Sequence, residues 1–224
     1  MQASNHSFIA TADKGKVSAI FLSPAKSIAT LVLGHGAGAD MRHAHMQAIA
    51  NSLAAAGIAT LRFNFPYMEA GGKRTDSKGI CTETIGNALI CANQLGESST
   101  LLLGGHSFGG RMASHFVAES NPDIAGLIYY SFPLHPAGKP GTSRADHLKS
   151  ISIPQLFLSG THDRLADLTL LRGVVTGLKQ AKIHELDTAD HSFRILKRSR
   201  ESAEDVYKEV ARVTAEFAET VTGR

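Results

Sequence analysis

The sequence predicts a three-layer α/β/α sandwich around a mostly parallel central sheet. Short apolar runs alternate along the chain with segments of helical spacing, and no internal repeat is visible. A repeated order of strand then helix favours a parallel sheet covered by helices on both faces. Of the 224 residues, 43% are hydrophobic and 19% are charged, which provides a sizeable core and excludes a disordered chain. We expect one domain over residues 1–224, with little or no cap.

Seven short apolar runs are interpreted as strands, because runs of this length without helical spacing are typical of buried strands. In parallel sheets the reactive groups gather at the carboxyl ends of the strands, where the connecting loops converge. The residues that follow each run are therefore the first candidates for a functional site. The predicted strands are 17–22, 30–33, 59–65, 100–103, 124–130, 154–158 and 183–186.

Three segments show the spacing of an amphipathic helix. Apolar residues recur at i, i+3, i+4, i+7 and i+8 within 46–54, and Gly57 follows where a helix can end in the left-handed conformation. A similar stripe covers 85–95, and a third, within 206–217, predicts a helix near the end of the chain. The serine and aspartate of 202–205 have the spacing of a capping box for that last helix.

A candidate nucleophile lies between a predicted strand and a helical segment. Residues 105–109 read Gly-His-Ser-Phe-Gly. Glycines two positions before and two after a serine permit a turn too tight for side chains, and this turn projects the serine hydroxyl into the crevice. Ser107 is therefore the predicted nucleophile. The competing interpretation is a glycine-rich turn with an idle serine.

A serine hydroxyl is a weak nucleophile and requires a base, which is usually a histidine. In this architecture the chain order is serine, acid, histidine, and the histidine follows the last strand. His191 occupies that loop. His184 lies inside the preceding strand and His162 lies one strand too early, so His191 is the predicted base.

The acid that orients the base should follow the preceding strand. Asp163 does so, after a glycine turn, although it could instead cap the next helix. Asp190 is adjacent to His191, but neighbouring residues on a turn seldom point their side chains at one another. Asp167 is a weaker rival within the following helical segment. Asp163 is the predicted acid.

Two backbone N–H groups are candidates for an oxyanion hole, the set of donors that stabilises the negative carbonyl oxygen of an acyl-transfer intermediate. One belongs to Phe108, directly after the nucleophile. The other belongs to Ala37, with Gly36 as the alternative, in the small-residue loop 34–40. Glycine loops also hold nucleotides, but this loop has neither the Lys-Ser/Thr of a phosphate-binding loop nor a G-x-G-x-x-G spacing.

The substrate pocket is the least determined part of the sequence. Tyr67, Met68 and Phe193 are predicted to line it, although such residues are as often part of the core. The basic residues of 73–78 could favour an anionic substrate, or could simply form an exposed loop. The longest candidate lid is 133–150, which is too short for a large cap.

Composition narrows the partners and the compartment. The net charge is +3 with scattered Lys and Arg, so we expect no nucleic acid partner. Cys81 and Cys91 lack metal-site spacing, which favours a reducing, cytoplasmic setting. No signal segment or apolar run of about 18 residues is present, so no membrane association is expected.

His43 and His45 diverge at a helix entrance, where we expect surface residues and no metal site. The oligomeric state is left open.

Several motifs together resemble the α/β-hydrolase superfamily. They are 35–38 (His-Gly-Ala-Gly), 105–109, Asp163 and 190–193 (Asp-His-Ser-Phe). The sequence is similar to small, cap-poor relatives of dienelactone hydrolases. It is more similar to a group that includes the hydrolase-like subunit of the animal NSL acetyltransferase complex, with 62–74 resembling that group's loop after its fourth strand. True dienelactone hydrolases use a cysteine nucleophile, so the serine here implies an esterase or thioesterase.

We expect a serine hydrolase that cleaves a small carboxylic ester or thioester through an acyl-enzyme, without a metal or an organic cofactor. Ser107 would attack, His191 would transfer the proton and Asp163 would orient His191, while Ala37 and Phe108 would hold the oxyanion. The alternative from another class is a non-catalytic binding or scaffold protein with the same fold. A peptidase would need an extended cleft for the peptide.

Overall fold

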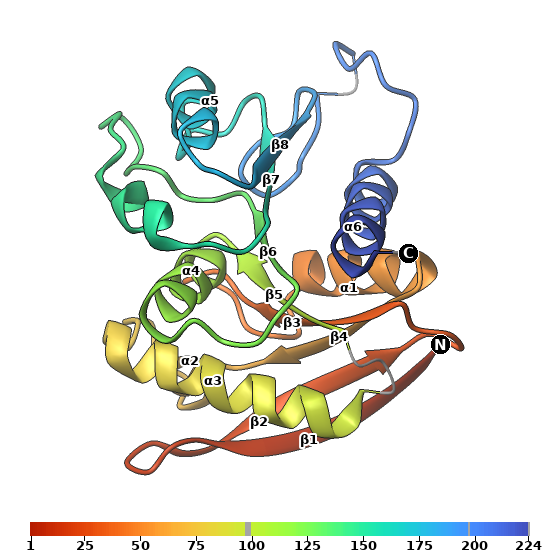
Figure 1. Ribbon diagram of the computed structural model, residues 1–224, viewed down its shortest axis with the longest axis vertical. Coiled ribbons are helices and arrows are strands. Elements are labelled where there is room, and N and C mark those ends of the chain that lie inside the picture. Colours follow the sequence, from red (N-terminus) through yellow and green to blue (C-terminus); the bar gives the residue numbers. More distant parts are fainter. Residues whose placement is uncertain (97–99, 197, 224) are drawn as a thin grey trace.

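The computed structural model describes residues 1–96, 100–196 and 198–223. One sheet crosses the molecule in the strand order β1-β2-β4-β3-β5-β6-β7-β8 (Figure 1). The β1–β2 and β2–β4 pairs are antiparallel, and every pair from β4 to β8 is parallel. The predicted mostly parallel sheet is therefore confirmed. The strands are β1 (Gln2–Thr11), β2 (Gly15–Ser23), β3 (Ala29–Gly34), β4 (Ile58–Phe63), β5 (Leu101–His106), β6 (Gly126–Tyr130), β7 (Gln155–Gly160) and β8 (Ala181–Leu186).

Helices cover both faces of the sheet, as the three-layer prediction requires (Figure 1). Helices α1 and α6 pack on one face, and α3, α4, α5 and the 3-10 helix η1 pack on the other. No helix among the described ranges is both long and apolar enough to cross a membrane. The helices are α1 (Ala44–Ala55), α2 (Pro66–Glu69), α3 (Lys78–Leu95), α4 (Phe108–Ser120), η1 (Ser143–Ser150), α5 (Leu168–Thr176) and α6 (Val206–Thr222).

The central strands are buried on both faces because their apolar side chains alternate between the two helical layers. On β3, Leu31 and Leu33 join the core under α1 and α6, whereas Val32 joins the core under α3 and α4. All three are fully buried. Each such side chain contributes about 1.5–3 kcal/mol relative to an exposed one.

The segment 133–150, the longest candidate for a lid, does not form a cap. Its helix η1 places Ala145 and Leu148 in the core below α4. Pro133 accepts a hydrogen bond from the Arg144 side chain at 3.4 Å. These contacts hold the segment against the body of the protein, which confirms the expectation of little or no cap.

Two helix ends test the capping predictions. Gly57, which follows the C-cap Ala56 of α1, has φ +83°, so the predicted left-handed end is confirmed. The predicted capping box of 202–205 is wrong, because Asp205 itself caps α6 and accepts hydrogen bonds from the first helical N–H groups. Ser202 instead accepts a hydrogen bond from the N–H of Glu204, before the helix begins.

Candidate active site

A strained turn joins β5 to α4 and carries the predicted nucleophile. Ser107 has φ 51° and ψ −113°, a conformation that non-glycine residues rarely adopt. The residues two positions before and after it are glycines for a steric reason. A Cβ on Gly105 would lie 2.5 Å from the backbone nitrogen of Gly110, and one on Gly109 would overlap the carbonyl of Gly34. The close approach of backbone to backbone therefore requires the glycines of the motif.

Three loops bring a hydroxyl, an imidazole and a carboxylate together at the carboxyl edge of the sheet. The Ser107 Oγ lies 2.8 Å from His191 Nε2, and His191 Nδ1 lies 2.8 Å from Asp163 Oδ2. Asp163 is fully buried as a side chain, and its other oxygen accepts the N–H of Leu165 at 2.8 Å. A carboxylate can only accept, so Nδ1 of His191 carries the proton and Nε2 is free to accept from the serine. The cap of α5 is Asp167, not Asp163.

The rival residues lie elsewhere or serve other contacts. Asp190 Oδ1 accepts two backbone N–H groups of its own loop, at 2.8 and 3.0 Å. His184 lies 2.8 Å from the Glu209 carboxylate on α6, and His162 is exposed. None of these side chains has a described hydrogen bond to the serine–histidine pair.

The sequence did not reveal that His106 holds the loop of the candidate base. Its Nε2 donates to the backbone carbonyl of His191 at 2.9 Å, and the two rings are 5.2 Å apart. Burial lowers the pKa of His106 to about 4, so this donor is neutral. The residue before the nucleophile thus fixes the loop after β8, 85 residues away. The only signal in the sequence was its position inside the motif.

The loop after β3 is held by two side chains that direct its peptide groups. His35 is buried; its Nε2 accepts the N–H of Phe65 at 3.1 Å, so its Nδ1 donates to the carbonyl of Gly36 at 2.8 Å. Burial lowers the pKa of His35 to about 4 and keeps it neutral. The hydroxyl of Tyr67 donates to the carbonyl of Ala37 at 2.9 Å. Because C=O and the next N–H point in opposite directions in a trans peptide, the N–H of Ala37 points away from His35.

The other predicted oxyanion donor begins a helix. The N–H of Phe108 is the first of α4, where backbone N–H groups have no acceptor within the helix and the dipole favours negative charge. The ring of Phe108 is half-buried against Phe65 and Tyr67. Of the predicted pocket residues, Met68 is half-buried, whereas Tyr67 and Phe193 are 6% and 2% exposed. Substrate contact by these three residues stays a prediction.

Of the histidines and basic residues considered in the sequence, His45 alone differs in exposure from the expectation. His43 is exposed and caps α1, but His45 is buried, and the expectation that it lies on the surface is wrong. Its Nδ1 lies 3.0 Å from the hydroxyl of Tyr207, and this hydrogen bond connects α1 to α6. Lys78 forms an exposed ion pair with Glu119. No group of three or more metal-ligating side chains is placed to hold a metal ion within the described residues.

Known proteins share this architecture. Solved structures similar to the chain include a dienelactone hydrolase from Anabaena variabilis (17% identity, TM-score 0.73, 97% of each chain covered). They also include the esterase domain of a Rhodothermus marinus protein (18% identity, TM-score 0.72, 98% of this chain and 99% of the other). A third is an α/β serine hydrolase without a lid from Xanthomonas campestris (18% identity, TM-score 0.71, 100% of this chain and 95% of the other). A family model described as an alpha/beta hydrolase domain matches residues 27–219. The chain belongs to the alpha/beta hydrolase family.

Proposed function

We propose that the protein is a serine hydrolase that cleaves a small carboxylic ester or thioester through an acyl-enzyme intermediate. The supporting observation is the hydrogen-bonded series from Ser107 Oγ through the His191 imidazole to the Asp163 carboxylate, with both contacts at 2.8 Å. A nucleophile, a base within hydrogen-bond reach and a buried group that orients the base are the three parts that nucleophilic acyl transfer requires.

In the first half-reaction the Ser107 oxygen attacks the substrate carbonyl carbon while its proton moves to Nε2 of His191. Asp163 stabilises the imidazolium through Nδ1–H. The negative oxygen of the tetrahedral intermediate accepts hydrogen bonds from the N–H groups of Ala37 and Phe108. The bond to the leaving group then breaks, and His191 gives its proton to the departing oxygen or sulfur.

In the second half-reaction a water molecule replaces the leaving group. Its oxygen attacks the acyl carbon while His191 accepts its proton, and a second tetrahedral intermediate forms at the same two N–H groups. When this intermediate collapses, the carboxylic acid leaves and His191 returns the proton to the oxygen of Ser107. The enzyme is regenerated without a cofactor.

The open architecture supports a small acyl group. The segment 133–150 packs into the body of the protein and adds no cap over the serine. Phe108 and Met68 are half-buried apolar residues beside the turn and the neighbouring α2, and they would contact a short acyl chain. The similarity to an esterase domain supports ester chemistry at the level of the fold.

An active-site-directed fluorophosphonate probe tests the proposal. We expect the wild-type protein to be labelled and Ser107→Ala to be unlabelled. Ser120→Ala is the matched control, because its hydroxyl lies at the far end of α4 and donates to the backbone carbonyl of Phe116. A panel of p-nitrophenyl esters and acyl thioesters of graded length should show a preference for short chains. Folded wild-type protein that neither reacts nor hydrolyses any of them would instead support the alternative of a non-catalytic binding or scaffold protein.

A further inference from the structure

A hollow of about 780 Å³ lies between the loop after β7 and the loop after β8. We call it the His191 basin, because the candidate base forms part of its wall. The loop after β8 is closed on itself: the N–H of Asp190 donates to the carbonyl of Arg194, and Ala189 pairs with Ile195. The basin therefore has a defined wall. Residues that line it include Arg164, Thr188, Asp190, His191, Arg194 and Leu196.

The position of the basin relates it to one half of the substrate. In the proposed reaction the acyl carbon is bonded to Ser107, and His191 passes its proton to the departing oxygen or sulfur. The leaving group must therefore lie against the imidazole of His191, whose side chain is 20% exposed. A hollow bordered by His191 is suited to receive the leaving group.

Thr188 is a buried and unpaired polar group at the basin. Thr188 is 5% exposed, and its Oγ1 has no hydrogen-bond partner among the described residues. Its φ is 57°, which is rare for a β-branched residue. The N–H of Thr188 donates to Thr161 Oγ1 at 2.9 Å, which holds this conformation. Buried hydroxyls are normally satisfied, and this oxygen is itself buried, so it must turn towards the hollow that Thr188 lines to meet a polar partner there.

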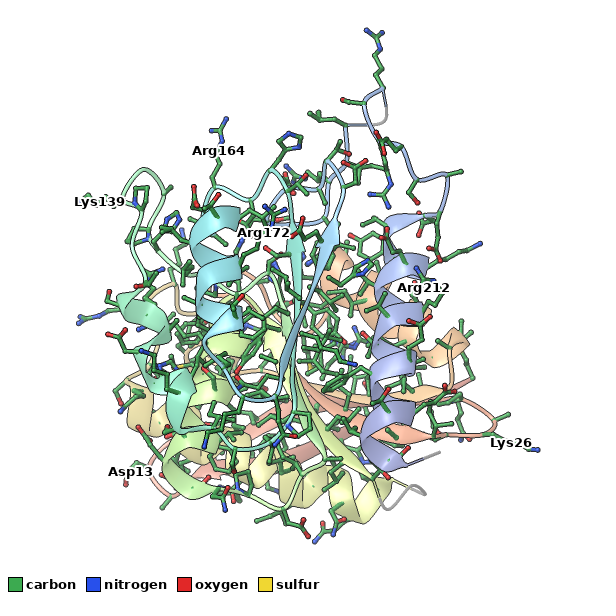
Figure 2. The ribbon with its side chains drawn as sticks, turned by 45° about the horizontal axis from the view of Figure 1, so that its top comes forward. Asp13, Lys26, Lys139, Arg164, Arg172 and Arg212 are labelled. Carbon is green, nitrogen blue, oxygen red and sulfur yellow. The ribbon has the colours of Figure 1, made fainter. Side chains whose placement is uncertain are left out.

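Two cations border the same hollow. Arg164 and Arg194 are exposed, and neither forms an ion pair with any carboxylate in the described part of the chain. Figure 2 shows Arg164 projecting from the top of the molecule, far from Lys26. The one carboxylate at the basin, Asp190, directs Oδ1 to backbone N–H groups of its own loop. Arg172, Arg200 and Arg212 are paired with glutamates, whereas Arg42, Arg74 and Arg144, like the two basin arginines, form no ion pair in the described part of the chain. The position of Arg164 and Arg194 beside the hollow is what distinguishes them.

We propose that the His191 basin binds the leaving-group half of the substrate, and that this leaving group is an alcohol or thiol that carries an anionic group. Arg164 and Arg194 attract the anion, the hydroxyl of Thr188 hydrogen-bonds a polar atom of the leaving group, and Leu196 packs against its apolar part. The inference rests on the proposed hydrolase function and specifies the substrate class of that same site.

Two esters with one acyl group test the proposal: 4-sulfamoylphenyl butyrate and 4-sulfophenyl butyrate, whose leaving groups are similar in size and electron withdrawal but differ in charge. We expect kcat/KM to be about fivefold higher for 4-sulfophenyl butyrate at low salt, which is the size of effect that two exposed ion pairs produce. The ratio should fall towards one in the double variant Arg164→Gln/Arg194→Gln and in high salt. Lys26→Gln, which removes an exposed cation far from the basin, should keep the wild-type ratio. A wild-type ratio of one, or a ratio that survives the double variant, overturns the proposal.

Thr188→Val tests the basin without removing a charge. Valine keeps the β-branched shape and replaces the unpaired hydroxyl, so we expect the variant to fold at least as well as the wild type. Its kcat/KM for 4-sulfophenyl butyrate should fall by about fivefold if the hydroxyl bonds the leaving group. An unchanged kcat/KM in a folded variant contradicts the role of Thr188.

An equilibrium measurement separates failure of the basin from failure of the hydrolase proposal. Ser107→Ala protein is titrated calorimetrically with 4-hydroxybenzenesulfonate, with and without the two arginine substitutions. Binding that the arginine substitutions abolish supports the basin even if neither ester is hydrolysed, in which case only the hydrolase proposal fails. Absence of binding to Ser107→Ala, alongside hydrolysis of both esters at equal rates by the wild type, overturns the basin and leaves the hydrolase proposal standing.

Discussion

Tyr67→Phe tests whether the loop after β3 is an oxyanion hole held by its carbonyl groups. The substitution removes one hydroxyl, which donates to the carbonyl of Ala37 at 2.9 Å, and leaves the ring in place. A neutral hydrogen bond contributes about 1 kcal/mol net. If that free energy holds the donor geometry in the transition state, kcat falls about fivefold. This is well short of the loss of about a hundredfold that follows removal of a whole oxyanion donor.

The assay is steady-state hydrolysis of a short p-nitrophenyl ester, with kcat and KM determined separately. We expect a lower kcat with little change in KM, because the hydroxyl acts on the transition-state donor rather than on the bound substrate. Tyr130→Phe is the matched control: it removes a buried hydroxyl that contacts Thr214 at 3.2 Å on the opposite face of the sheet. Equal losses of kcat in both variants, or a change confined to KM in Tyr67→Phe, would refute the reasoning.

Three further outcomes are expected. Asp163→Asn should lower kcat by about 10⁴, because the amide can donate to His191 Nδ1 and so favours the tautomer that cannot accept the serine proton; full activity would exclude this acid. Lowering the pH from 7 to 5.5 should reduce the free energy of unfolding, measured by urea titration. His35 and His106 have folded-state pKa values of about 4, below the value of about 6.5 in the unfolded chain. As the pH falls, the unfolded chain binds protons first, so each histidine lowers the free energy of unfolding by about 1.4 kcal/mol at pH 5.5. A stability independent of pH contradicts this. Gly109→Ala should destabilise the protein by about 3 kcal/mol, because its Cβ would overlap Gly34, and a wild-type melting temperature would disprove that contact.

Local patterns were sufficient to predict most of the sheet and the neighbourhood of the site. Each predicted strand overlaps an observed one, because strands buried on both faces read as continuous apolar runs. The glycine–serine motif identified Ser107, and chain order then selected His191 and Asp163; their side chains lie within hydrogen-bond distance in the structure. Their catalytic roles stay predictions.

The sequence did not predict β1, an edge strand with mostly exposed or half-buried side chains. The segment Gln2–Thr11 has few apolar residues, and Ile9 is largely exposed, so it lacks the apolar run that identified the other strands. Edge strands need only one covered side, and their pattern is correspondingly weak.

The supporting hydrogen bonds were also beyond local patterns. The contact of His106 with the carbonyl of His191 joins two segments far apart in the chain, as does that of Tyr67 with Ala37. Such bonds depend on how loops meet in three dimensions, and neither residue type nor spacing indicates them. The same reason explains why burial of His45 was not foreseen.

The buried histidines near His191 bear on the proton transfer that we propose. Burial lowers the pKa of His45 to about 3 and that of His106 to about 4, so both rings are uncharged at neutral pH. In the proposed reaction they would therefore add no positive charge that repels a protonated His191, and neither would compete with it for the proton of Ser107. A histidine-rich interior thus behaves as an electrically neutral lining, which would leave the proposed proton transfer to the imidazole of His191.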